Sequence, residues 1–203
     1  MSRGISWMVD AARPSVERKD TMYYEAVSQC TRMLRNIGTW LDKAEKHAAA
    51  KTFDVNILMT DRLAPDVKPF IYQVQSACDY VKGAAAWLSG QVPPKHEDNE
   101  QTIGDARARI QKTVAFAESV SEAQYAGASD RKVSLLSAAS GEHLGGKDYL
   151  LQITIPNVYF HLRALTRGRH GTIEPVTFSI AISETYWRTR GIQTPDRLLK
   201  ISL

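Results

Sequence analysis

The stretch MYYEAVSQCTRMLRNIGTWLDKAEKHAAAK, residues 22–51, decides the fold. Its apolar residues recur at alternating steps of three and four positions, which places them on one stripe of an α-helix. They are Val27, Cys30, Leu34, Ile37, Leu41, Ala44 and Ala48. This alternation is typical of helices that pack at shallow angles in a bundle. The stretch therefore predicts a long helix that contributes one seam to a helical bundle.

Two later segments, 65–89 and 102–120, repeat this spacing of apolar residues. In the first segment, Pro65 suits the opening turn of a helix, where a missing N–H costs little. In the second, Thr102 and Asp105 resemble a capping box with aspartate in the place of glutamate. Three helices with matching seams predict a bundle that needs a fourth helix to close its core.

The periodicity changes after residue 120. The runs Val133–Leu136 and Tyr149–Ile155 are short and apolar, and the second is strongly β-favouring, so together they predict a small β-hairpin. Pro156 then stands where a first helical residue is expected. The apolar face that follows it holds Val158, His161, Leu162 and Leu165. We therefore predict a mainly α fold, an up-and-down four-helix bundle with a small β-hairpin between helices three and four.

We expect the bundle to occupy residues 22–168, between a loose N-terminal extension, 1–21, and an atypical basic tail, 169–203. The formal net charge of +4 is carried wholly by residues 163–203, where arginine outnumbers lysine six to one. We hypothesise that this terminal segment is frame-shifted or disordered and is not native to the fold. A neutral body with a basic tail gives little support for a phosphate-binding surface, which needs lysine and arginine concentrated on a folded face, so no nucleic-acid partner is expected.

The sequence contains neither a secretory signal pattern nor an apolar run of the roughly 20 residues that a membrane span requires. We therefore expect a cytoplasmic protein without a membrane partner. Cys30 and Cys78 have neither a CxxC arrangement nor the spacing of metal ligands, and buried free thiols are expected.

Several segments, in this order along the chain, resemble a known family. They are Arg62-Leu63-Ala64-Pro65-Asp66, Gln73-Val74-Gln75 with Ala77-Cys78-Asp79, Pro93-Pro94 with Glu97 to Thr102, Asp148-Tyr149-Leu150, and Pro156 to His161. Over residues 22–162 the chain is similar to the DinB-like superfamily of four-helix bundles, in particular to a branch described as a domain of unknown function. The resemblance implies a left-handed bundle and no established reaction.

Better-studied members of the superfamily hold a divalent metal with three histidines, one from the second helix and two spaced i, i+4 on the last helix. Several of them act on low-molecular-weight thiols. In this chain the last-helix pair falls on Asn157 and His161, and the second-helix position falls near Gln75 or Asp79. His47 lies near the end of the first helix. The resemblance thus predicts His161, Asp79, Asn157 and His47 as ligands of one divalent metal, Zn, Ni, Mn or Fe, and no catalytic residue is predicted.

Each of these residues also has an interpretation without a metal. The interpretation without a metal is the favoured one for His161, as a hydrogen-bonded core histidine on the inner helix face, and for Asp79, as an ion-pair partner of Lys82 or Arg62. The acidic run 97–100 is expected to be a solvated loop. Surface positions are expected for His96, His143 and His170.

Two functions remain open. The first is a small-ligand-binding or self-associating bundle, a homodimer, without evident catalysis. The alternative is a metal-dependent enzyme of the thiol transferase or hydrolase type with a retuned metal site. No nucleophile elbow, P-loop or dinucleotide fingerprint is present.

Overall fold

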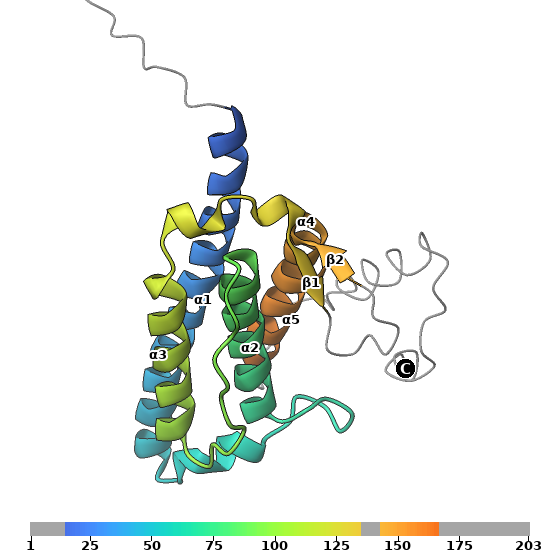
Figure 1. Ribbon diagram of the computed structural model, residues 1–203. Helices are drawn as coiled ribbons and strands as arrows, with labels where there is room; N and C mark the ends of the chain where they lie inside the picture. The colour runs from blue at the N-terminus through green and yellow to red at the C-terminus, as the bar shows by residue number, and fades with distance from the viewer. Residues whose placement is uncertain (1–14, 135–142, 167–203) are drawn as a thin grey trace, which may run out of the picture.

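The computed structural model describes residues 15–134 and 143–166, in which long helices pack side by side (Figure 1). The four longest are α1 (Ser15–Lys51), α2 (Phe70–Leu88), α3 (Ile103–Ser119) and α5 (Ile155–Thr166). The predicted mainly α bundle is confirmed. The predicted tail, 169–203, lies outside the described residues. None of the helices in the described part of the chain is both long and apolar enough to span a bilayer.

The helix α1 begins at Ser15, inside the segment that was predicted to be a loose extension. Side chains of its first described turns contact a distant loop. Asp20 Oδ2 accepts a hydrogen bond from Gly127 N at 3.1 Å, and Thr21 Oγ1 donates to Glu122 Oε1 at 2.8 Å. These contacts tie the start of the helix to the loop after α3, which the apolar periodicity could not reveal.

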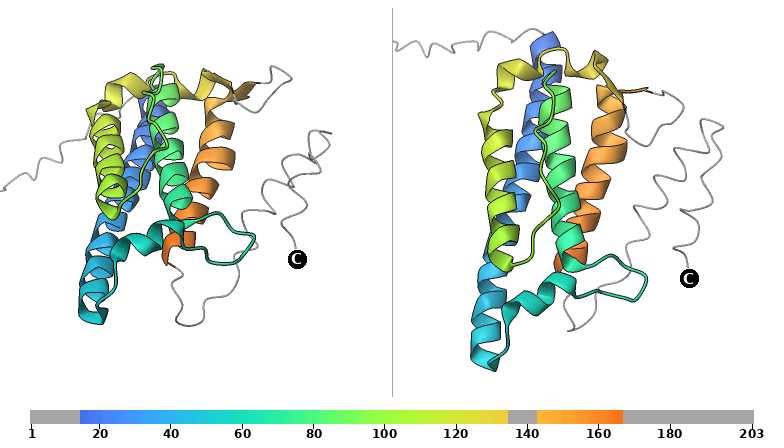
Figure 2. Two further views of the ribbon diagram at one scale, coloured as in Figure 1. Left: turned by 90° about the horizontal axis from the view of Figure 1, so that it is seen from below. Right: turned by 60° about the horizontal axis from the view of Figure 1, so that its bottom comes forward.

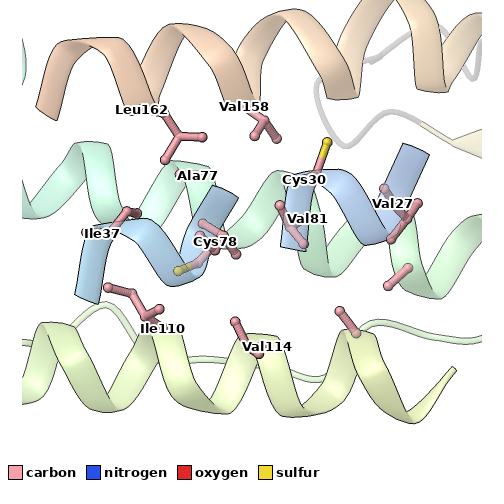
Figure 3. Packing of buried hydrophobic residues seen from close by; sticks show 14 of the residues in the cluster. Val27, Cys30, Ile37, Ala77, Cys78, Val81, Ile110, Val114, Val158 and Leu162 are labelled. Atoms are coloured by element: carbon pink, nitrogen blue, oxygen red, sulfur yellow. The ribbon is translucent and has the colours of Figure 1, made fainter. Parts of the chain in front are cut away.

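The predicted seams meet in one shared core. Leu34, Val74 and Ile110, from α1, α2 and α3, are buried in a single cluster. Figure 3 shows Val158 and Leu162 of α5 directed toward the same interior. The core prediction from three- and four-residue spacing is therefore confirmed.

Both cysteines are buried free thiols, as expected. Burial raises the pKa of the Cys30 thiol to about 11 and that of the Cys78 thiol to about 12. A thiol with such a pKa is not deprotonated near neutral pH and is a poor nucleophile. Neither cysteine is therefore suited to thiol chemistry.

The second helix begins later than the sequence predicted, at Phe70, with Pro69 as its N-cap residue. A short 3₁₀ helix, η1 (Val55–Thr60), and a loop precede it. A helix beginning at Pro65 would place Pro69 past the opening turn, where its ring collides with the carbonyl four residues earlier. The prediction of Pro65 as the helix start was wrong because Pro69 is accommodated only at the N-cap of the helix.

The helices α2 and α3 begin at the same end of the bundle. Phe70 N donates to Asp61 O at 2.8 Å, and Ile103 N donates to Asn56 Oδ1 at 3.0 Å, so both helices start beside η1. The segment 89–102 returns along the bundle between them (Figure 1). The predicted up-and-down order therefore does not hold for α2 and α3, which run parallel across a long connection.

A buried arginine holds this crossover segment in place. The Arg109 side chain on α3 is 2% exposed. Its guanidinium donates to Asp79 on α2 at 2.9 Å, and to Asp98, Glu100 and the Glu97 carbonyl at 2.8–3.0 Å. The acidic run 97–100 was expected to be a solvated loop. Residues 97–99 are indeed exposed, but the expectation was wrong for Glu100, whose side chain is buried beside the Arg109 cation.

Glu100 is the buried carboxylate of this cluster, with a side chain that is 8% exposed. Its second oxygen accepts a hydrogen bond from Gln75 Nε2 at 2.8 Å. Burial alone would raise the pKa of Glu100, but the hydrogen bonds from Gln75 and Arg109 outweigh it and lower the pKa below the usual range. Glu100 is therefore ionised at neutral pH.

The predicted hairpin is present, but its second strand is another segment. The strand β1 (Lys132–Ser134) pairs antiparallel with β2 (His143–Gly145), and the buried pair Val133 and Leu144 lies opposite. The predicted strand Tyr149–Ile155 is helical instead. A continuous helical run comprises α4 (Gly146–Asp148), the π-helix η4 (Tyr149–Thr154) and α5.

The π-helix explains how Pro156 can lie inside this run. Proline lacks the N–H for the usual bond to the fourth residue back, and its ring collides with that carbonyl. In the widened turn Ile155 N–H instead bonds Leu150 O, five residues back. Tyr149, Leu150 and Thr154 are buried here, so core packing overrides the β-favouring composition.

Replacing Arg109 with methionine should lower the free energy of unfolding by about 3 kcal/mol, because Glu100 would remain buried without its cation. Urea denaturation at pH 7 measures this change. The control is Lys95→Met, which removes an ion pair to Glu97 from a lysine side chain that is 85% exposed and should cost at most about 1 kcal/mol. An equally small loss for Arg109→Met would contradict the role of the cluster.

Two glycine-to-alanine substitutions should change the stability of the fold in opposite directions. A Cβ at Gly146 would overlap the backbone carbonyl of Ala128, so Gly146→Ala should destabilise the fold. A Cβ at Gly38, in the middle of α1, meets nothing within 4 Å, so Gly38→Ala should stabilise the fold by about 0.5–1 kcal/mol. Thermal denaturation of the two variants distinguishes these outcomes, and a stabilised Gly146→Ala protein would refute the close approach.

Candidate functional site

His161 of α5 is buried, with 7% of its surface exposed, and it is hydrogen-bonded to α2. Its Nδ1 lies 2.8 Å from Gln73 Oε1. The Gln73 amide nitrogen donates to the Lys68 carbonyl at 3.0 Å. Since this bond turns the amide oxygen toward His161, the proton of the neutral imidazole resides on Nδ1. The pair joins α5 to α2, and the bond to Lys68 extends this connection to the loop that precedes α2.

Aromatic rings enclose the imidazole of His161. Tyr80 is stacked on it at a centroid distance of 5.7 Å, and Phe160 and Tyr72 meet it edge-on at 5.1 and 6.3 Å. Burial lowers the pKa of His161 to about 4. The imidazole is therefore uncharged at neutral pH, which matches the interpretation as a hydrogen-bonded core histidine.

Asp79 is engaged by cations. Its Oδ1 accepts from Lys82 Nζ at 2.7 Å and from Arg109 at 2.9 Å. The predicted pairing with Lys82 is confirmed. The alternative partner, Arg62, instead donates to the Val67 carbonyl at 3.0 Å.

The other two predicted ligands have different neighbours. His47 is exposed near the end of α1, and its ring lies 5.9 Å from that of Phe53. The amide nitrogen of Asn157 donates to the Ile153 carbonyl at 2.7 Å. Within residues 15–134 and 143–166, no three His, Cys, Asp or Glu side chains are close enough to hold a metal ion. Metal binding by these residues stays a prediction.

The residues at the position of the superfamily's metal site do not fit a divalent transition metal. The α2 side chain that is hydrogen-bonded to His161 is Gln73, not Gln75 or Asp79, near which the sequence placed the second-helix position. With Asn157 one turn before His161, this place offers two amides and one imidazole. Transition-metal sites in proteins use imidazole, thiolate and carboxylate ligands, so we derive no chemistry through a metal here.

His96 in the crossover segment is not the surface residue that was expected. Both ring nitrogens are buried and have no hydrogen-bond partner among the described residues. Burial, followed by the positive charges of Lys82, Lys112 and Arg109, lowers its pKa. His143 is exposed on β2, as expected, and His170 lies outside the described residues.

A cavity of about 650 Å³ opens at the end of the bundle where α2 begins. Its walls come from the second half of α1, η1, the loop 61–68, the start of α2 and the last turn of α5. Figure 2 shows this loop extending beside the end of α5. The main apolar lining residues are Ile37, Trp40, Leu41, Leu58, Phe70 and Leu165.

The polar groups of the cavity lie on its loop side. They are Asp61, Arg62, Lys68 and the amide of Gln73. Gln73 thus belongs both to the cavity wall and to the hydrogen bond with His161. Sequence reasoning missed Gln73, although it lies four residues before the buried Ala77 and so faces the core.

The free energy of unfolding should fall as the pH drops from about 6.5, the ordinary pKa of histidine, toward the native value of about 4. In this range the unfolded chain binds a proton at His161 that the native chain does not bind. The loss should reach about 3 kcal/mol, measured by urea denaturation across the range. His96 also has a lowered pKa and contributes to the same loss of stability at low pH. The unmodified protein is therefore compared with His161→Gln, whose free energy of unfolding should depend less steeply on pH. Identical slopes would refute the buried neutral imidazole.

The comparisons with known proteins agree with this fold. Residues 22–165 match the family described as Domain of unknown function (DUF1993), close to the span 22–162 on which the resemblance rested. A solved structure, a DinB family member from Shewanella denitrificans, is 32% identical, with a TM-score of 0.69. The alignment covers 88% of this chain and 92% of that one. A search of curated proteins found no match. The chain therefore belongs to the DUF1993 family of domains of unknown function and has the DinB-like fold.

Proposed function

We propose that this protein binds a small, largely apolar ligand in the cavity at the end of the bundle. The cavity volume of about 650 Å³ carries the proposal, because sites for small molecules typically measure roughly 300–1,000 Å³ and are lined mainly by apolar side chains. A few polar groups on one side would fix the orientation of the ligand.

The loop 61–68 supports this proposal. Its Asp61 carbonyl accepts a hydrogen bond from Phe70 N at the start of α2, and residues 61–65 all line the cavity. The bond from Arg62 to the Val67 carbonyl closes the loop on itself. The second half of α1, the ends of α2 and α5 and a closed loop therefore form the walls, which supports a site that is formed before a ligand enters.

The alternative, a metal-dependent thiol transferase or hydrolase, has less support. His161, Asp79, Asn157 and His47 each bond or contact groups other than one another. Both thiols are buried with raised pKa values. Self-association as a homodimer, and a cytoplasmic location, stay predictions.

Decanol, a neutral apolar probe, should bind and change the fluorescence of Trp40, which lines the cavity. Ala44→Phe, which places a larger side chain in the lining, should weaken binding by about tenfold or more, equivalent to about 1.4 kcal/mol. The control is Ala50→Phe at an exposed position of the same helix, which should bind decanol as the unmodified protein does. Trp40→Phe should remove the fluorescence change. The proposal fails if decanol does not bind, or if both phenylalanine variants bind it unchanged.

A further inference from the structure

The loop side of the cavity carries two cations that lack a carboxylate partner among the described residues. Arg62 and Lys68 both line the cavity, and neither has an ion pair there. Some other surface arginines do have carboxylate partners. Arg35 is bound to Glu118, and Arg107 is bound to Asp42 and Glu45. The two cavity cations are thus available to a ligand.

Both side chains are held in position by other contacts. One guanidinium nitrogen of Arg62 donates to the Val67 carbonyl, which fixes the side chain but uses only part of its planar set of donors. The Lys68 ammonium lies 5.7 Å from the centroid of the Tyr72 ring, a cation–π contact. A guanidinium fixed in this way can bind a carboxylate or phosphate through paired hydrogen bonds.

Asp61 is the remaining charged group of the lining. With Arg62 and Lys68 it leaves this side of the cavity with one surplus positive charge. A cationic head group would meet two like charges for one opposite charge, whereas an anionic head group meets the reverse. The charge balance favours an anion.

The α1 part of the cavity lining is apolar, whereas the loop 61–68 supplies all the charged lining residues together with some apolar ones. Ile37, Trp40 and Leu41 come from α1, whereas the charged residues come from the loop before α2. We infer that the ligand is an amphipathic anion with an alkyl or similar apolar body, whose carboxylate or phosphate binds Arg62 and Lys68 while its body packs against α1. This inference rests on the proposed ligand-binding function.

The test compares decanoate, decanol and decyltrimethylammonium, which share the alkyl chain and differ in head-group charge. Binding is followed by Trp40 fluorescence at low and high salt. Decanoate should bind about tenfold more tightly than decanol, and the cation more weakly than either. Added salt should weaken decanoate binding and leave decanol unaffected, because exposed charges are screened.

Three variants test the charged residues. Lys68→Met, whose side chain holds no loop hydrogen bond, should weaken decanoate binding by about fivefold and leave decanol binding unchanged. The Arg62→Met, Lys68→Met double variant should remove the preference for decanoate. The control for it is Arg32→Met with Lys132→Met, an arginine and a lysine that are exposed elsewhere. Asp61→Asn removes the negative charge of the lining and should therefore increase the affinity for decanoate.

The outcomes separate the two proposals. If decanol binds but decanoate binds no better and none of the charge variants matters, the inference is overturned while ligand binding stands. If no probe binds, both fail. A Trp40 response to vesicles of phosphatidylglycerol without free amphiphile would assign the charges to a bilayer surface and would overturn the inference of a free ligand.

Discussion

The neutralisation of the Arg109 guanidinium is the constraint on which the arrangement of this bundle depends. A cation that is 2% exposed must be surrounded by anions, and three carboxylates reach it, one from α2 and two from the crossover segment. The segment 89–102 therefore lies along α2 and α3 rather than looping into solvent. Because it travels back along the bundle, α2 and α3 begin at the same end. That end is where the cavity forms, so the ion cluster and the candidate site are two results of one chain path.

The fold could be predicted from the sequence wherever apolar spacing alone decided it. Cys78 and Ile110 lie in the core because their positions repeat with the helical period, and the Thr102–Asp105 capping box is present as expected. The errors arose where a distant contact overrode local preference. The β-favouring run at 149–155 became helical because the bundle buries it. Glu100, expected to be solvated, is buried because it pairs with an arginine nine residues later, whereas Asp98 pairs with the same arginine and stays exposed.

The candidate site was less accessible to sequence reasoning than the core. Helical spacing correctly placed His161 on the inner face, but it does not fix how α2 is rotated and shifted against α5. Two residues along a helix turn a side chain to nearly the opposite side, so Gln73 and Gln75 face different partners: His161 for the former, Glu100 for the latter. The cavity combines three separate stretches of the chain, within 37–44, 58–73 and 164–165, and no local sequence pattern predicts that they come together.

The shared amide of Gln73 gives the molecule an internal spectroscopic probe. The amide oxygen of Gln73 accepts a hydrogen bond from His161 Nδ1, and the amide nitrogen donates one to the Lys68 carbonyl in the cavity loop. An imidazole N–H that is shielded from water exchanges slowly with solvent, so it yields an observable downfield proton resonance in NMR spectra. Any rearrangement of the loop that moves the Lys68 carbonyl would pull on the amide and shift that resonance. The chemical shift of this His161 proton, on α5, therefore reports the conformation of the loop before α2.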